Sequence, residues 1–308
     1  MKRFAAWLLR LKPYRVYQAY SQAGGNLSAA GMSFQALFAV FAGLWVAFAV
    51  FGLFLRSNTR VRDAIIAFIN IQIPGLIGPH GLINPDALYS VTTLSVSGVI
   101  ALVIMAWTAV NWIDYARVAI HHMFGLPPQQ FGYVYLKVAD FMIAVAYGIF
   151  VLVGALLSVF ATSLFVTVIS AIGLANTLDS AMDVLLRGLS ILVVLVLDTF
   201  MLGALIRLLA GAAIAWRFLW RGAVLGGIAL GAMKLAGAAL LGGATRNPLL
   251  ASVAVFVGLL IWFNLTSRVT LLTAQWMATG MRDAGIDPRD VGWVITRDSL
   301  AKPFRRRR

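Results

Sequence analysis

The sequence predicts an all-α fold, a polytopic membrane bundle of six transmembrane helices, and two observations lead to this prediction. Of the 308 residues, 61% are hydrophobic and 12% are charged. Soluble domains carry about 45–50% apolar and about 25% charged residues. Apolar runs long enough to cross about 30 Å of hydrocarbon as a helix occur repeatedly. We place them near 33–55, 90–113, 138–168, 182–210, 222–243 and 249–280.

The segment before the first run, residues 1–32, is predicted to lie at the cytoplasmic interface. Apolar residues from Phe4 to Leu11 recur at helical spacing with basic residues on the other faces, which is typical of a helix lying in the membrane surface. Pro13 is expected to break this helix because proline lacks the amide proton.

Two further segments complete the predicted organisation around a transmembrane domain over 33–280. The first outer connection, 56–89, contains VRDAIIAFINIQIPGLIG, which we interpret as a short amphipathic helix ended by proline and glycine. The tail 281–308 is polar and finishes FRRRR. We expect it to be flexible and held near anionic lipid by its charge.

The basic residues predict the orientation of the chain. Eighteen Lys and Arg flank the runs on the side that includes both termini, and four (Arg56, Arg60, Arg62 and Arg246) lie on the other side. Positively charged flanks stay in the cytoplasm, so both termini are expected there, in a bacterial inner membrane. The net charge of +14 then indicates anionic headgroups at the cytoplasmic face as partners. Nucleic acid is not expected, because no basic run is interleaved with aromatic residues.

The residue types argue against an enzyme. The chain has neither Cys nor Glu, and its three His are not clustered with acids, so no metal site is expected. No phosphate-binding loop of the GxxxxGK[ST] type occurs, and no cofactor is indicated.

The fifth run contains Gly222/Gly226 and Gly227/Gly231 at GxxxG spacing. Small residues at this spacing let helix backbones approach closely. We interpret the pattern mainly as packing. A hinge or sliding face is the alternative, and the pattern also permits a homodimer.

Ionisable residues inside the predicted spans are the candidate functional groups, because lipid cannot satisfy them. At 1.5 Å per residue, Asp198 lies about 24 Å from the outer end of its run, and Arg268 lies about 28 Å from the outer end of the last run. We therefore expect Asp198 to be the first partner of Arg268. The candidate substrate-binding residues are Asp198, Asn264, Arg268, Lys234, Arg187, Asp114 and Asp140.

Three interpretations of this set remain open. The groups could form a buried ion pair that locks the helix register. They could line a net-positive cavity, open to the cytoplasm, that binds a phosphate or carboxylate group. The long basic side chains could also extend to the inner headgroups.

Three stretches of the sequence resemble the YihY/BrkB family of bacterial inner-membrane proteins: Gly25 to Phe48, Ala215 to Lys234 and Asn247 to Gln275. The resemblance spans roughly residues 15–280 and implies six helices with both ends cytoplasmic. Family members have been labelled ribonuclease BN and virulence factor, and envelope or lipid export roles have been suggested. The nuclease label conflicts with the missing metal ligands.

The chain departs from the family pattern in two places. Members often carry Ser and Pro in the first helix, where this chain has Ala39 and Ala42. The closing Gly-Ala-Glu of many members corresponds here to Thr273, Ala274 and Gln275, so a role for that acid does not transfer.

The leading functional hypothesis is a transporter or lipid translocase with a positively lined, cytoplasm-facing cavity for an anionic substrate. The second hypothesis is a non-transporting scaffold or envelope-assembly factor. An enzyme acting on nucleic acid is the third, and metal-dependent cleavage by the purified protein would be needed to support it.

Overall fold

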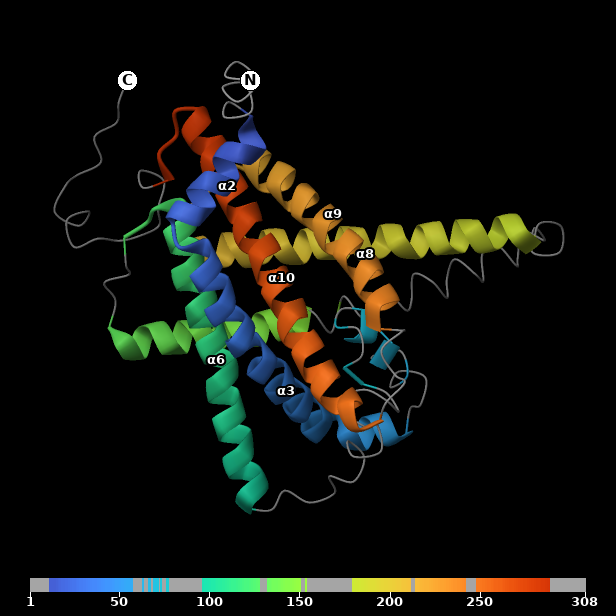
Figure 1. The fold of residues 1–308 in the computed structure, drawn as a ribbon. Helices are drawn as coiled ribbons and strands as arrows, with labels where there is room; N and C mark the ends of the chain where they lie inside the picture. Colours follow the sequence, from blue (N-terminus) through green and yellow to red (C-terminus); the bar gives the residue numbers. More distant parts are fainter. Residues whose placement is uncertain are drawn as a thin grey trace.

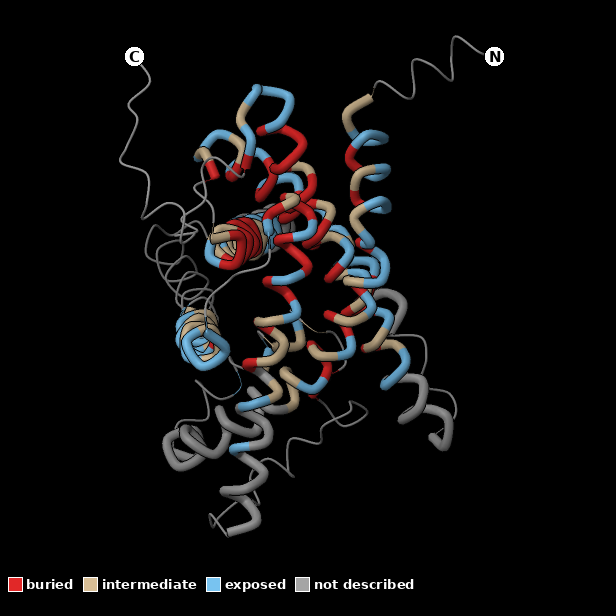
Figure 2. Tube along the Cα trace, turned by 90° about the vertical axis from the view of Figure 1, so that its left-hand side faces the viewer, coloured by how far each residue is buried: buried red, intermediate tan, exposed pale blue. Residues whose placement is uncertain are grey.

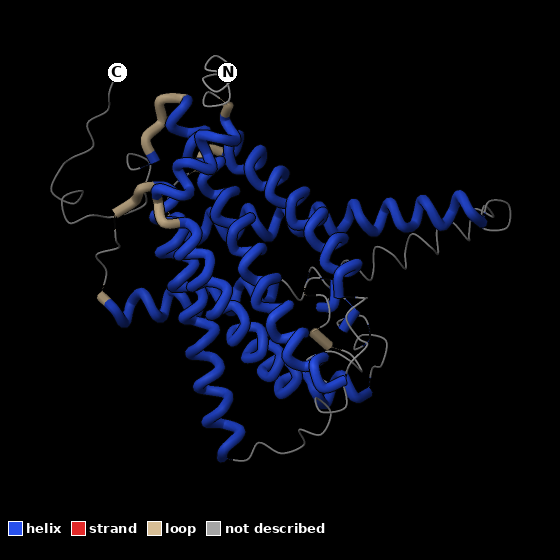
Figure 3. Tube along the Cα trace, in the orientation of Figure 1, coloured by secondary structure: helices blue, strands red, loops and turns tan. Residues whose placement is uncertain are grey.

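The computed structural model describes residues 11–57, 96–127, 132–150, 153, 179–211, 214–241 and 248–288, with scattered positions in 63–77. Parts of α3, α6 and α8 are described by their backbone alone. The regular structure of these residues is helical, without β-strands, as Figure 3 shows. This confirms the all-α prediction. The helices are α2 (Lys12–Gln22), α3 (Gly25–Ser57), α6 (Val96–Phe124), α8 (Asp179–Ala210), α9 (Trp216–Leu241) and α10 (Pro248–Asp283), with a further helix over Tyr133–Phe150.

Four helical segments of the described residues are long and apolar enough to cross a membrane. They are Tyr133–Phe150, Ile191–Ala210, Trp216–Gly237 and Phe256–Asp283. They overlap the third to sixth predicted runs, so the protein is a membrane protein. Helices α3 and α6 overlap the first and second predicted runs. Six spans remain a prediction, because many side chains of these two helices lie outside the described residues.

Helix α10 occupies the centre of the arrangement (Figure 1). It packs against α2, α3 and α6 on one side and against α9 on the other, and α9 in turn packs on α8. Figure 2 shows buried residues along the helices that meet at α10. The buried cluster joins residues of every labelled helix, including Tyr20, Met32, Ile120, Ile206 and Leu271.

Two helices run steeply across α10: α8 and the helix over Tyr133–Phe150. Both extend beyond the other helices in Figure 1 and are seen nearly end-on in Figure 2. Only 6% of the Tyr133–Phe150 segment is buried inside the protein. The protein itself therefore leaves most of this helix's apolar surface uncovered. Such low burial is typical of a helix that faces lipid.

Pro13 stands in the first turn of α2, which begins directly after the extended residue Leu11. The interfacial helix expected before Pro13 falls on residues 1–10, outside the described residues, so its break near Pro13 stays a prediction. Proline is well tolerated there because the first amide protons of a helix have no partner within it. The turn from α2 into α3 uses Gly24 at φ +70°, a left-handed conformation that favours glycine. The Tyr20 ring packs so closely on Gly25 that a β-carbon there would not fit.

Helix α6 continues beyond the second predicted span, 90–113, to Phe124. Asp114 and Arg117 lie in this continuation and have charged partners on the neighbouring helix.

The first outer connection approaches the helices through Leu76 and Ile77. Both residues are buried against α3 and α10, in contact with a cluster that includes Leu37 and Trp262. The amide of Asn70 donates to the Ile77 carbonyl at 2.7 Å and its oxygen accepts from the Ile77 amide at 3.1 Å. Within the predicted amphipathic segment, the described residues Asp63, Ile66, Ala67, Ile69, Asn70 and Ile71 are helical, and the residues between them lie outside the described part of the chain.

Candidate functional site

Asp198 of α8 is paired with Lys234 of α9. The Lys234 ammonium donates to both carboxylate oxygens, at 2.6 and 2.7 Å. The two side chains are 3% and 10% exposed, so the pair is sealed between the helices. The expected pairing of Asp198 with Arg268 is therefore replaced by a pairing with Lys234, which removes the negative group from the site predicted around Arg268.

Close packing of α8 on α9 brings this pair together. Gly227 faces Thr199, and a β-carbon there would lie 3.2 Å from the Thr199 backbone. Gly226 faces the side chains of Leu202 in α8 and Thr273 in α10. These contacts support the packing interpretation of the glycine pattern, because the glycines let α9 approach two helices of the same chain.

A second set of charged groups lies between α6 and the helix over Tyr133–Phe150. Arg117 and Asp140 form an ion pair with side chains only 7% and 0% exposed. Lys137 donates to Asp114 and to Asn111, both at 2.9 Å. These contacts attach a helix that is otherwise little buried to α6. Asp114 and Asp140, two of the predicted site residues, are thus held by basic partners that the sequence analysis left out of the site.

The remaining predicted residues are placed differently. Arg268 is exposed and Asn264 is half-buried, both on α10. No carboxylate of the described residues forms an ion pair with Arg268. The side chain of Arg187 in α8 lies outside the described residues. The structure therefore pairs Asp198 with Lys234, whereas Asp114 and Asp140 pair with Lys137 and Arg117 and not with Arg268.

Arg268 belongs to a line of polar residues along α10, which we call the α10 polar face. At about 100° per residue, its members lie within about 40° of the direction of Arg268, and Leu272 is the apolar residue among them. Gln275 is only 1% exposed. Its amide donates to the Thr279 hydroxyl at 3.3 Å, while its oxygen has no partner among the described residues. The α10 polar face comprises Asn264, Arg268, Gln275, Thr279 and Arg282.

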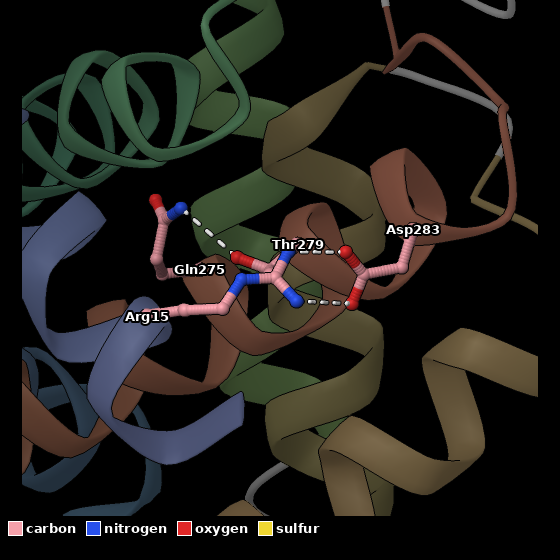
Figure 4. A network of polar contacts seen from close by, with 4 residues as sticks. All are labelled: Arg15, Gln275, Thr279 and Asp283. Carbon is pink, nitrogen blue, oxygen red and sulfur yellow. Dashed lines mark hydrogen bonds and ion pairs between the residues drawn. The ribbon is translucent and has the colours of Figure 1, made fainter. Parts of the chain in front are cut away.

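Helix α2 lies over the end of this face. Arg15 forms an ion pair with Asp283, and Figure 4 shows this pair beside the Gln275–Thr279 hydrogen bond. The Lys12 ammonium lies 4.6 Å from the centre of the Trp276 ring, a cation–π contact. These two contacts hold the first turn of α2 against α10.

A pocket of about 270 Å³ opens between α2 and α10. Arg282 borders it and donates to the carbonyls of Met123 and Phe124 at the end of α6, at 3.4 and 3.1 Å. The carbonyls that end a helix carry partial negative charge, which orients this guanidinium. The pocket is lined by Arg15, Gln18, Ala19, Gln22, Thr279 and Arg282.

The Arg268 side chain also acts on α2. Burial raises the pKa of the Tyr20 hydroxyl in α2, and the positive charge of Arg268 opposes this shift. Tyr20 donates to the Asn26 side chain at 3.3 Å, just after the turn into α3. The positive charge of Arg268 therefore acts close to the junction of α2 and α3.

The sequence analysis missed the residues of the pocket. Thr279 and Arg282 could have been found together with the neighbouring Gln275, because Gln275, Thr279 and Arg282 follow Arg268 at seven, eleven and fourteen residues and so share one face of the helix. Arg15 and Asp283 are 268 residues apart, and no local pattern links them. Among the described residues, no three His or Asp side chains lie close enough together to hold a metal ion.

A protein family and a single relative each match nearly the whole length of this chain. The family described as virulence factor BrkB matches residues 16–291. An uncharacterized protein of Dickeya dadantii (strain 3937) is 26% identical over 289 residues, which covers 89% of this chain and 86% of that protein. No solved structure matches the chain.

Proposed function

The chain belongs to the virulence factor BrkB family, and we propose that this membrane protein is a transporter or lipid translocase for an anionic substrate. The substrate's charged group would move along the α10 polar face. Its apolar part, if it is a lipid, would remain in the bilayer beside the helix. The protein's own basic residues would supply the counter-charge along this path.

One observation carries the proposal: Arg268 is exposed within the apolar segment Phe256–Asp283, without an ion-pair partner in the described chain. Placing such a group at bilayer depth costs about 2.5–3.5 kcal/mol on insertion scales. Other ionisable groups of the predicted set avoid this cost by pairing, as Asp198 and Lys234 do. An anionic substrate would supply the partner that Arg268 lacks.

The rest of the α10 polar face supports a path toward the pocket. Gln275 lies about 10 Å along the helix from Arg268, and Thr279 lies about 16 Å away. Thr279 lines the pocket and offers its hydroxyl to a passing headgroup, and the buried Gln275 holds that hydroxyl in place. Arg15 and Arg282 then supply positive charge at the pocket, which is the predicted cytoplasmic end.

The test is movement of a fluorescent anionic phospholipid across vesicles that contain the purified protein. Arg268→Gln should slow this movement at least about tenfold, equivalent to about 1.4 kcal/mol in the barrier. Thermal unfolding of the variant should be unchanged, because Arg268 makes no ion pair with a described carboxylate. Arg221→Gln is the matched control, since it removes another exposed arginine, one at the start of α9.

Normal movement in the Arg268→Gln protein would show that the substrate path is assigned wrongly. Zwitterionic phosphatidylcholine should move no faster than in protein-free vesicles, because it offers Arg268 no net negative charge. Equal acceleration of both lipids would contradict a selective anion path.

A non-transporting scaffold is the second candidate. The two ion pairs buried between helices, Asp198 with Lys234 and Arg117 with Asp140, favour it, because they suit a rigid assembly. A scaffold should move no lipid in any variant. It should also retain partner proteins when isolated in mild detergent.

A further inference from the structure

We propose that the pocket between α2 and α10 binds a phosphate group, which takes the place of Asp283 on Arg15. The ligand class is a phosphate monoester or diester, carried by a lipid headgroup or by a soluble anion. This inference deepens the proposed function, on which it rests, by naming where the anionic substrate first docks.

The donors around the pocket suit a phosphate. Arg15 and Arg282 provide guanidinium groups, whose planar fork matches phosphate oxygens with two parallel hydrogen bonds. Gln18 and Gln22 stand one turn apart on α2 and add amide donors. Thr279 accepts a hydrogen bond from Gln275, so its own hydroxyl proton is left to donate. The pocket of about 270 Å³ is large enough for a phosphate with part of its headgroup.

The contact between Arg15 and Asp283 makes an exchange feasible. The two side chains are 45% and 36% exposed, unlike the buried pairs deeper in the protein. Ion pairs at such exposure contribute little to stability, because water solvates both groups and salt screens them. A phosphate carries more acceptor oxygens than a carboxylate, so it can replace Asp283 on Arg15 at little cost.

The buried Gln275 holds one of the residues that line the pocket. Its side chain is 1% exposed and is held by Thr279, which lines the pocket directly. The Arg282 guanidinium is likewise held in place by two carbonyls of α6. Two donors are therefore oriented before a ligand arrives, which reduces the entropy lost on binding.

Because the ligand is proposed to take the place of Asp283 on Arg15, substitutions of these two residues should change the ligand affinity in opposite directions. In neutral detergent, short-chain phosphatidate is titrated into the full-length protein by calorimetry. Arg15→Gln should weaken binding at least about tenfold, as expected for the loss of a charge-assisted hydrogen bond. Asp283→Asn should tighten binding, because it removes the competing carboxylate. Arg221→Gln, outside the pocket, should bind like the unmodified protein.

Further measurements identify the class of ligand and check that each variant is folded. Inorganic phosphate alone, titrated in the same way, should show the same order of variants if the site takes a soluble anion. If only phosphatidate binds, the site is one for lipid. Arg15→Lys should give intermediate affinity, since it retains the charge without the fork. Each variant is compared after its thermal unfolding has been measured.

The proposal is overturned if neither ligand binds, if Asp283→Asn binds no more tightly, or if Arg15→Gln matches Arg221→Gln. These outcomes are separate from a failure of the proposed function. Binding with the expected order, without lipid movement in vesicles, would keep the phosphate site and reject translocation. Lipid movement that depends on Arg268 but not on Arg15 would keep translocation and reject the phosphate site.

Discussion

Single residues in this protein show two ways to place a charge on a largely apolar helix: in a buried ion pair, or exposed without a partner among the described carboxylates. Lys234 lies against Asp198 in a sealed contact between α8 and α9. Arg117 has a buried partner in Asp140 on the next helix. Arg268 has neither and remains exposed. The difference has a physical consequence: removal of a charge is costly where it leaves a buried partner unpaired, and mild where no partner exists.

The Asp198–Lys234 pair gives a prediction at this scale. Asp198→Leu or Lys234→Leu alone should lower the free energy of unfolding by about 3–5 kcal/mol, because each leaves one buried charge uncompensated. The double variant should recover most of that loss, since it leaves neither charge. Unfolding in mixed micelles, followed by far-ultraviolet circular dichroism, measures all three. Additive losses in the double variant would show that the two groups do not depend on each other.

At the scale of helices, the glycines of α9 decide how closely it approaches α8. Gly227 and Gly231 belong to the same sequence pattern, yet their surroundings differ. A β-carbon at Gly227 would lie 3.2 Å from the Thr199 backbone, whereas at Gly231 the nearest atom would be 3.9 Å away, in the Leu195 side chain. The pattern indicates a packing face, and the contacts show which glycine makes the close approach.

Alanine substitutions test this difference. Gly227→Ala should lower the free energy of unfolding by about 1–3 kcal/mol, as overpacking does. Gly231→Ala should leave it unchanged or raise it by up to about 1 kcal/mol, since alanine favours helix where space allows. Thermal unfolding of the two variants in the same detergent compares them directly. Equal destabilisation by both would contradict the packing of α8 on α9 described here.

At the scale of the whole molecule, the distribution of charge predicts the orientation in the membrane. Basic residues concentrate on the side of α2 and the end of α10, where the pocket also lies. The positive-inside rule assigns this side to the cytoplasm. The proposed phosphate site would therefore meet the inner leaflet, where anionic lipid accumulates.

The natural sequence contains no cysteine, so single cysteines report the orientation without further changes. Ser57→Cys, at the end of α3, should react with a membrane-impermeant maleimide on intact spheroplasts. Ser21→Cys in α2 and Ser299→Cys in the tail should react only after permeabilisation. Labelling of Ser299→Cys on intact spheroplasts would place the tail outside and reverse the orientation.

Much of the fold could be predicted because hydrophobicity is a local property of the chain. The apolar runs and the glycine pattern predicted helices at the positions of α9 and α10, and the all-α class is confirmed. The partners of Asp114 and Arg117 could not be predicted, because Lys137 and Asp140 lie on another helix. The charge of a side chain is visible in sequence, whereas its neutralisation depends on another helix.

The sequence by itself determined that this chain is a membrane protein and which ionisable residues are unusual within its apolar runs. Both can be identified without knowing which helices are adjacent. Only the tertiary structure decided the pairing. It joined Asp198 to Lys234 and left Arg268 exposed. It also brought Arg15 against Asp283 from the opposite end of the chain. Partner choice depends on which helix faces meet, and the packing of side chains and glycines between helices fixes those faces.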